Sequence, residues 1–328
     1  MKKRFLFVLL IVVLFSMRAT AQSSLLATLN HEGTISTYYG VGALQEAYNA
    51  AANGDVITLS SGSFLGTDIK KAITLRGAGM AVDTVSHTEP TVISNDFTIN
   101  ISDTLDHRFT MEGIYSNQDI KISCLQNAMF LKCRFKYVGC TSSTSKMKDL
   151  NFIHCRIAED FILSDNGSAA FINSIVLGVY QYNSETSVFS FTNCYVDNID
   201  MKHSEYKNCI IKAGNSWGYD NTTYYNNLCL STASSAINSL NNTNVKINPS
   251  DERVSFLNVD YSDSNDYVLT DAVRALIKGT DGTEVGIHGG SLPYDPTPTN
   301  PQITKFNVAS KSTADGKLSV DIEVNSDN

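Results

Sequence analysis

The hexapeptide FTNCYV at residues 191–196 is followed by YKNCII at residues 206–211. Both read as an aromatic residue, any residue, Asn, Cys, any residue and a β-branched residue. The pattern recurs with substitutions as FLKCRF at 130–135, FIHCRI at 152–157, FINSIV at 171–176 and YNNLCL at 225–230. Successive copies begin 15 to 22 residues apart. The chain therefore contains a repeat of roughly twenty residues, which is the signature of a stacked architecture.

Within each repeat the apolar positions are one, four and six, and the third position is polar. This spacing predicts two short strands that meet at a corner, as in one coil of a parallel β-helix. We expect position one to point inward and to stack on its equivalents: Phe130, Phe152, Phe171, Phe191, Tyr206 and Tyr225. Asn at the third position tolerates left-handed backbone, and we expect its amide to bond to the coil above. These bend residues are Lys132, His154, Asn173, Asn193, Asn208 and Asn227.

The cysteines have a structural explanation in this repeat. Position four is Cys133, Cys155, Ser174, Cys194, Cys209 and Leu228, which predicts an inward ladder of small residues rather than redox or metal chemistry. No CxxC pair is present to indicate a zinc site. Cys124, Cys140 and Cys229 fall outside the ladder, and a bridge between Cys124 and Cys140 is conceivable but is not established by the sequence.

Residues 1–21 have the pattern of a secretory signal peptide. A basic start precedes the apolar run from Phe5 to Phe15, and Ala19-Thr20-Ala21 matches a cleavage site. We expect an exported chain without a membrane span, located in the periplasm, on the cell surface or in the medium. The formal net charge of −8 becomes −12 when the four basic residues of the signal are removed. This excess of acid argues against nucleic acid as a partner.

The ends of the expected coil have their own signals. Residues 41–55 predict a capping helix with Leu44, Ala47, Tyr48 and Ala51 on one face, followed by strands at 56–60 and 72–79. Four of the six prolines lie in residues 291–301, which predicts a stiff linker. Residues 302–328 predict a β-hairpin tail with strands at 303–308 and 317–324. The remaining residues, 22–290, form the expected β-helix domain.

The stretch ANGDVITLSSGSF at 52–64, followed by KAITLRGAG at 71–79, resembles the N-terminal cap and first coils of the pectate-lyase-like superfamily. Residues 266–290 are similar to the way secreted bacterial members end their coil. The resemblance covers residues 36–290 and implies an all-β fold, a right-handed parallel β-helix with a short capping helix. It does not imply one activity, because this fold carries lyases, hydrolases, adhesins and proteins without known chemistry.

Polysaccharide chemistry on this fold needs specific groups on the outer face of neighbouring coils. A lyase needs a basic residue and acidic ligands for Ca²⁺, and a hydrolase needs paired carboxylates. Counting from the repeat predicts an outward row of Lys121, Ile162, Tyr180 or Tyr182, Asp200, Lys202 and Trp217, which contains one carboxylate. Asp197, Asp200, Lys202 and His203 are the catalytic candidates, although a solvated coil surface explains them more simply.

Aromatic residues provide the other signal. Trp217 and Tyr219 lie in the polar loop GNSWGYD, and Tyr180 and Tyr182 lie two coils earlier. Exposed rings beside Asn and Asp hold the faces of sugars, although rings that cover the outside of the coil would look the same in sequence.

Three hypotheses follow. The first is an exported non-catalytic β-helix protein that binds glycan or a cell-surface partner and needs no cofactor. The second is a polysaccharide lyase or glycoside hydrolase acting on a uronate-containing polysaccharide, with Ca²⁺ only if it is a lyase. The third is a structural or adhesin-like assembly module whose hairpin donates strands to a partner.

Overall fold

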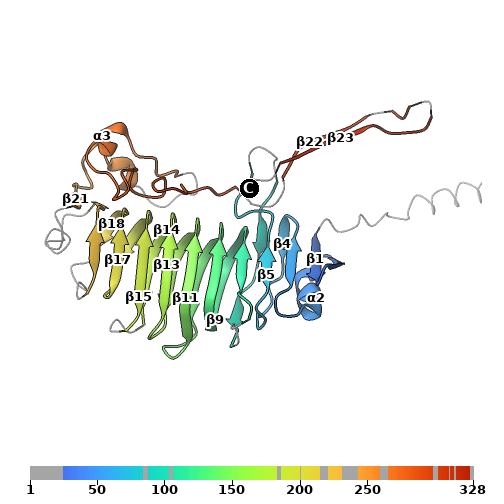
Figure 1. Cartoon of the computed structure of the whole chain (residues 1–328), viewed down its shortest axis with the longest axis horizontal. Helices are drawn as coiled ribbons and strands as arrows, with labels where there is room; N and C mark the ends of the chain where they lie inside the picture. Colours follow the sequence, from blue (N-terminus) through green and yellow to red (C-terminus); the bar gives the residue numbers. More distant parts are fainter. Residues whose placement is uncertain are drawn as a thin grey trace, which may run out of the picture.

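The computed structural model describes residues 25–83, 88–102, 106–182, 186–199, 201–214, 221–230, 243–258, 265–297, 302–309, 311–313 and 315–325. The expected signal peptide lies outside these residues. The described chain is nearly all β and forms a parallel β-helix of about eight turns (Figure 1). This confirms the fold class that the repeat predicted.

The N-terminal end of the coil is closed by a hairpin and a helix. Strand β1 (Leu26–His31) pairs antiparallel with β2 (Thr34–Tyr39) and with β3 (Val56–Leu59), the first strand of the coil. Helix α2 (Ala43–Ala50) buries Ala43, Leu44, Ala47 and Tyr48 against them. It is shorter than the predicted 41–55, because the backbone becomes extended at Ala51. The edge of the first coil is thereby covered, which removes a site for aggregation.

The coils are built from short strands that pair in parallel with the equivalent strand of the next coil. One stack runs β11, β13, β15, β17 and β19, and a second runs β10, β12, β14, β16, β18 and β20. The strands after β3 are β4 (Gly62–Phe64), β5 (Thr74–Arg76), β6 (Thr91–Ile93), β7 (Phe97–Asn100), β8 (Thr110–Glu112), β9 (Ile114–Leu131), β10 (Arg134–Cys140), β11 (Lys146–Ile153), β12 (Arg156–Leu163), β13 (Ser168–Ile172), β14 (Ile175–Gln181), β15 (Val188–Thr192), β16 (Tyr195–Ile199), β17 (Ser204–Lys207), β18 (Ile210–Gly214), β19 (Thr223–Tyr225), β20 (Leu228–Cys229) and β21 (Val245–Lys246).

The interior is organised around a stack of aromatic rings, which we call the inner aromatic ladder. Consecutive ring centroids are 4.5 to 5.1 Å apart and nearly parallel. Its members, all fully buried, are Phe130, Phe152, Phe171, Phe191, Tyr206 and Tyr224. The spacing matches the distance between neighbouring strands, so each coil places one ring on the ring before it.

The last coil departs from the predicted register by one residue. Tyr224, rather than Tyr225, continues the ladder, and Asn226, rather than Asn227, has the left-handed backbone of the bend (φ 53°). Asn227 takes position four, where it is fully buried and its Oδ1 accepts a hydrogen bond from the Cys209 amide (2.7 Å). The sequence pairs Tyr224-Tyr225 and Asn226-Asn227 allow both registers, and only packing distinguishes them.

The four ladder cysteines, Cys133, Cys155, Cys194 and Cys209, are fully buried and free. Each thiol is hydrogen-bonded to backbone: Cys194 Sγ, for example, donates to the Phe171 carbonyl of the preceding coil (3.3 Å). Cys124 and Cys140 are also free, so the structure contains no bridge between them. Cys229 is buried at position six of its coil, paired with Ile211.

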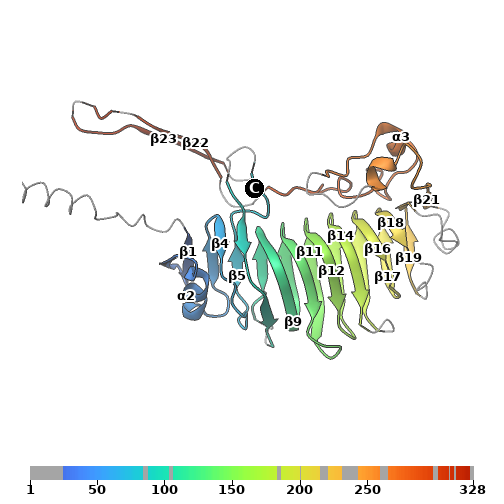
Figure 2. The same cartoon turned by 180° about the vertical axis from the view of Figure 1, so that it is seen from behind.

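A C-terminal segment, residues 265–297, lies along the solenoid, and we call it the arm. It includes α3 (Asp271–Arg274) and follows the short helix η1 (Ser255–Asn258). Figures 1 and 2 show it running from the end of the solenoid back along one rim toward the middle. Beneath it, outward side chains of the second stack (β14, β16, β18 and β20) form a second apolar core with the arm: Ile175, Tyr195, Ile210 and Leu228 with Leu269, Val273, Val285 and Ile287.

The bend residues hold the arm. Asn173 Nδ2 donates to the carbonyls of Ile287 (2.9 Å) and Gly289 (2.8 Å), and Asn208 Oδ1 accepts from the Thr280 amide (2.8 Å). The expectation that these amides bond to a neighbouring coil was therefore wrong for Asn173 and Asn208, but Asn227 Nδ2 does donate to the Asn244 side chain of the next coil (3.0 Å). A left-handed residue at a corner directs its side chain away from the stack, and the arm supplies the partners. We call the six left-handed residues at the third position of the repeat the bend row: Lys132, His154, Asn173, Asn193, Asn208 and Asn226.

The chain ends in the hairpin of β22 (Gln302–Val308) and β23 (Val320–Asn325), which pair antiparallel. It projects away from the solenoid (Figures 1 and 2).

Candidate functional site

The outer surface of β9, β10, β12 and β14 gathers polar and aromatic side chains in two rows, and we call it the β9–β14 face. Pairing places Asp119, Tyr137, Asp160 and Gly178 in one row. Two residues further along each strand lie Lys121, Gly139, Ile162 and Tyr180. Alternate residues of a strand share a side, so the two rows form one surface.

Two glycines shape this face. A Cβ at Gly139 would collide with the Tyr137 hydroxyl, and a Cβ at Gly178 would collide with Oδ1 of Asp160. Tyr137 therefore lies along its own strand, while Asp160 leans toward the next coil. Neither side chain could take this position over a larger residue, so the sequence reserves space for both groups.

The face carries both signs of charge. Lys136 Nζ lies 3.6 Å from Oδ1 of Asp119 and 3.9 Å from Oε2 of Glu159. Ion pairs this exposed contribute little to stability. Their consequence is that one positive and two negative side chains lie together on the face. Burial, followed by the charge of Glu159, raises the pKa of Asp160. Burial also raises the pKa of Tyr137, as do the neighbouring Cys140, Asp119 and Asp160. A protonatable carboxyl group thus lies beside a neutral phenol.

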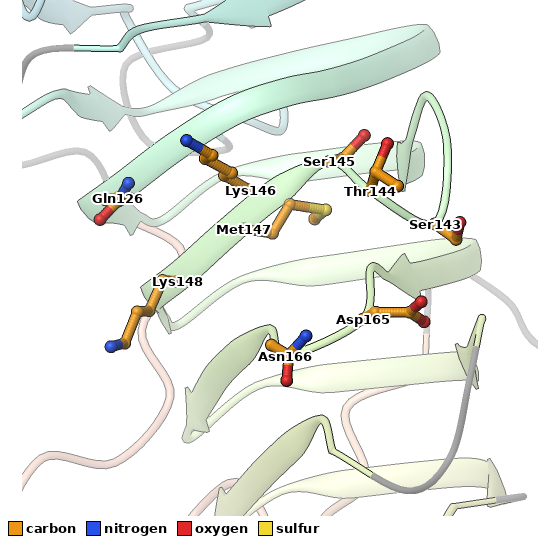
Figure 3. A pocket seen from close by; sticks show the side chains of 9 residues that line it. All are labelled: Gln126, Ser143, Thr144, Ser145, Lys146, Met147, Lys148, Asp165 and Asn166. Carbon is orange, nitrogen blue, oxygen red and sulfur yellow. The ribbon is translucent and has the colours of Figure 1, made fainter.

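A cavity of about 590 Å³ adjoins the face beyond the ends of β10 and β12. Its lining residues are Gln126, Ser143, Thr144, Ser145, Lys146, Met147, Lys148, Asp165 and Asn166 (Figure 3). The Asp165 amide donates to the Ser143 carbonyl (3.0 Å), which ties the two turns that border the cavity. Asp165 also contributes to the raised pKa of Cys140, the last residue of β10, although burial is the larger cause. Cavity and face are therefore neighbours.

The predicted catalytic candidates occupy separate places. Asp197 in β16 forms an ion pair with Lys212 of the next coil (3.0 Å). Lys202 and His203 lie in the turn before β17, where the Lys202 amide and carbonyl bond to the Gln181 side chain. Asp200, like Trp217 and Tyr219 among the predicted sugar-binding residues, lies outside the described residues.

The remaining predicted sugar-binding residues border the β9–β14 face. Tyr180 is partly buried in β14, and Tyr182 follows directly with 63% of its surface exposed. Sequence reasoning missed Asp119, Tyr137, Glu159 and Asp160. Strand alternation would have found Asp119 and Asp160, because they lie two residues before Lys121 and Ile162, which were placed on this side.

A smaller cavity of about 420 Å³ lies at the N-terminal cap and is lined in part by His31, His107 and Asp55. Nδ1 of His31 lies 2.9 Å from Oδ1 of Asp55, whose other oxygen accepts the Ala52 amide (2.7 Å). The hydrogen bond to Asp55 raises the pKa of His31. Because Asp55 bonds the hairpin turn to the end of α2, these contacts serve as a structural clasp.

Within the described ranges, no group of three or more His, Cys, Asp or Glu side chains is arranged to hold a metal ion. Of the described helices, none has the length and apolar character needed to cross a membrane. The chain matches no family model, no curated protein and no solved structure.

Proposed function

We propose that the protein is an exported member of the pectate-lyase-like β-helix superfamily that binds a polysaccharide on the β9–β14 face without transforming it. The carrying observation is the juxtaposition of Tyr137 and Tyr180 with the carboxylates of Asp119 and Asp160 beside a polar cavity. Tyrosine rings pack on the apolar faces of sugars, and carboxylates accept hydrogen bonds from their hydroxyls. The resemblance at residues 52–79 supports the superfamily.

The direction of the face supports a polymer as ligand. Equivalent side chains of neighbouring coils repeat at the strand spacing of about 4.8 Å, so the groups form a line across the coils rather than a closed pocket. Lys121 adds a positive charge in the second row, and the exposed Tyr182 adds a ring just after the end of β14. An extended chain can contact several of these groups at once, which gives useful affinity from individually weak contacts.

Binding to a panel of neutral and acidic polysaccharides tests the proposal. We expect Tyr180→Ala and Asp119→Ala each to weaken binding about tenfold or more, as expected for residues central to an interface. Glu205→Ala, in β17 of the other strand stack, is the control and should leave binding unchanged. The proposal fails if no polysaccharide binds, or if the control weakens binding as much as the other two variants.

One observation favours a glycoside hydrolase as the second candidate. Asp160, whose pKa is raised, shares the face with a second carboxylate, Asp119, two strands away. Glycoside hydrolases use a pair of carboxyl groups that flank the scissile bond, one of them protonated. Release of reducing ends that is abolished by Asp160→Asn, with binding retained, would establish this candidate. A lyase would instead produce unsaturated ends, detectable by ultraviolet absorbance, in a Ca²⁺-dependent manner.

The hairpin favours the assembly role as a third candidate. Val320, Ile322 and Val324 alternate along β23, and each is about half exposed. A two-stranded sheet is marginal in water, so this surface suits strand addition by a partner. Removal of residues 302–328 should abolish assembly but leave polysaccharide binding intact.

A further inference from the structure

The 590 Å³ cavity has a positive end. Lys146 and Lys148 are two residues apart on β11, so both lie on the same side of the strand, and both are exposed. Neither forms an ion pair within the part of the chain that the structure describes. Gln126 pairs with Lys148 across β9 and β11, and Figure 3 shows the Lys146 side chain extending toward the side of Gln126, while the Lys148 side chain extends away from it at the end of the strand. In a chain of formal net charge −8, this is a local concentration of positive charge.

The opposite end of the cavity is neutral to acidic and rich in hydroxyl groups. Ser143, Thr144 and Ser145 come from the turn before β11, and Asp165 and Asn166 come from the turn after β12 (Figure 3). Oδ1 of Asp165 is buried and accepts no hydrogen bond from the described residues. A buried acceptor without a donor is costly, and a ligand hydroxyl would supply one.

We infer that this cavity binds a sugar unit that carries a negatively charged oxygen group, a sulfate ester or a carboxylate, on the polysaccharide proposed above. The inference rests on the proposed function. The two lysines receive the charged group, while the hydroxyls, Asn166 and Asp165 receive the sugar hydroxyls. The volume of about 590 Å³ lies within the range of small-molecule sites.

The same charges limit how densely the polymer can be substituted. The neighbouring face carries Asp119 and Glu159, and the whole chain is acidic. A polymer charged on every unit would be repelled by this field. The ligand is therefore a largely neutral chain with sparse anionic substituents, one of which enters the cavity.

Matched polysaccharides test the inference with the full chain. Each neutral polysaccharide is compared with a lightly sulfated and a lightly carboxymethylated derivative of the same backbone, and the two derivatives distinguish the two sources of charge. We expect at least one derivative to bind about tenfold more tightly than its neutral parent, with the advantage falling as salt rises. The double variant Lys146→Ala/Lys148→Ala should remove the advantage but retain binding of the neutral parent.

Two controls separate this inference from the proposed function. Lys278→Ala removes one exposed positive charge on the arm and should have no effect. If neutral and anionic polymers bind equally, or if Lys278→Ala matches the double variant, the cavity assignment is overturned while face binding stands. If Tyr180→Ala changes nothing but the lysine variants weaken binding, the face is overturned and the cavity stands. If no polymer binds, both fail.

Discussion

The inner aromatic ladder and the bend row lie two residues apart in each coil, but they contact different partners. Phe152 stacks on Phe130 and Phe171 of the adjacent coils, whereas His154, two residues later, bonds to Leu292 of the arm. One position joins coil to coil, and the other joins coils to a distant segment. The short repeat thus encodes both the stacking of the solenoid and the attachment of its C-terminal cover.

The bend row itself changes character along the solenoid. Asn173, Asn208 and Asn226 bond the arm through neutral amides. At the other end Lys132 Nζ bonds to Asp295 Oδ2 (2.8 Å) and the Thr297 carbonyl (2.6 Å), and Nε2 of His154 lies 3.1 Å from the Leu292 carbonyl. The contacts near α3 are therefore insensitive to pH, while those near residue 297 involve titratable groups.

The largest effect should come from the inner ladder. Phe171→Ala removes a fully buried ring stacked on both sides, which we expect to cost about 3–5 kcal/mol in the free energy of unfolding. Urea unfolding measures this cost. Ile172→Ala, which changes the adjacent outward residue, should cost much less. Equal costs would contradict the assignment of Phe171 to the interior and Ile172 to the outer side of the strand.

A smaller effect should follow in the bend row. Asn173→Ala loses two hydrogen bonds to the arm, at about 1 kcal/mol each, and places Ala in left-handed backbone at about 1–2 kcal/mol. Asn173→Gly loses the bonds without the backbone strain. We expect both variants to speed amide hydrogen exchange in residues 285–290, with solenoid stability reduced mainly in the Ala variant. Unchanged exchange in the arm would contradict the contrast between the inner aromatic ladder and the bend row.

The titratable end should respond to pH. Burial, and to a lesser extent the charge of Lys132, lowers the pKa of His154 from 6.5. The unfolded state therefore binds more protons below about pH 6.5, so the stability of this contact falls as pH falls. The other titratable groups that face this contact are Lys132, Tyr294 and Asp295. The pKa of Asp295 is lowered from 3.8, so this carboxylate stays charged at pH 5. The protection factors of residues 292–297, which compare the measured exchange rate with the intrinsic rate at the same pH, should fall from pH 7.5 to pH 5.

His154→Asn tests the cause, because Asn tolerates the left-handed backbone and does not titrate. The pH dependence of the protection factors at residues 292–297 should disappear in this variant. The clasp at His31 gives an opposite reference: its pKa is raised by Asp55, so its contribution is present below about pH 6.5 and is lost as pH rises above that value. If both regions lose protection as the pH falls, or both lose it as the pH rises, the assignment to His154 is wrong.

The smallest effect is expected at the interruption of the cysteine ladder. Ser174 Oγ accepts from the Cys155 amide (3.0 Å) and donates to the Ile172 carbonyl (2.8 Å), which resembles the thiol contacts of Cys194. Ser174→Cys should therefore change stability by less than about 1 kcal/mol. Ser174→Val, which removes both polar contacts and adds bulk, should cost more. A large loss of stability in the cysteine variant would show that a thiol cannot replace the hydroxyl at this position.

The repeat was sufficient to predict the fold because each position has one environment in every coil. The first and fourth positions of the hexapeptide, Phe152 and Cys155 in the second copy, face the interior in successive coils. The copies therefore support the same interpretation. The prediction was wrong where a copy is ambiguous, at Tyr224-Tyr225, since two rings of similar size satisfy either register. It was also wrong about the amides of Asn173 and Asn208, because their partners lie 72 to 116 residues away in the arm.

The candidate site was harder to predict than the fold. Counting from the repeat placed Lys121, Ile162 and either Tyr180 or Tyr182 in one row, and the strand pairing selects Tyr180. It did not extend to Asp119 and Asp160, although alternation alone requires them on the same side. The cavity depends on how the turns at 141–145 and 164–167 meet, and turn geometry of that kind has no repeating signal in the sequence.

The arm is longer than the distance it covers. From the Lys278 contact at Asn226 to the Thr297 contact at Lys132, it passes 19 residues, which would span about 63 Å if extended. The six positions of the bend row are separated by five strand spacings, about 24 Å. The surplus is taken up in turns at residues 279–283 and 286–289. Because one coil adds only about 4.8 Å, we expect the arm to be long enough to reach Lys132 after the insertion of one coil, with the extra length drawn from these turns.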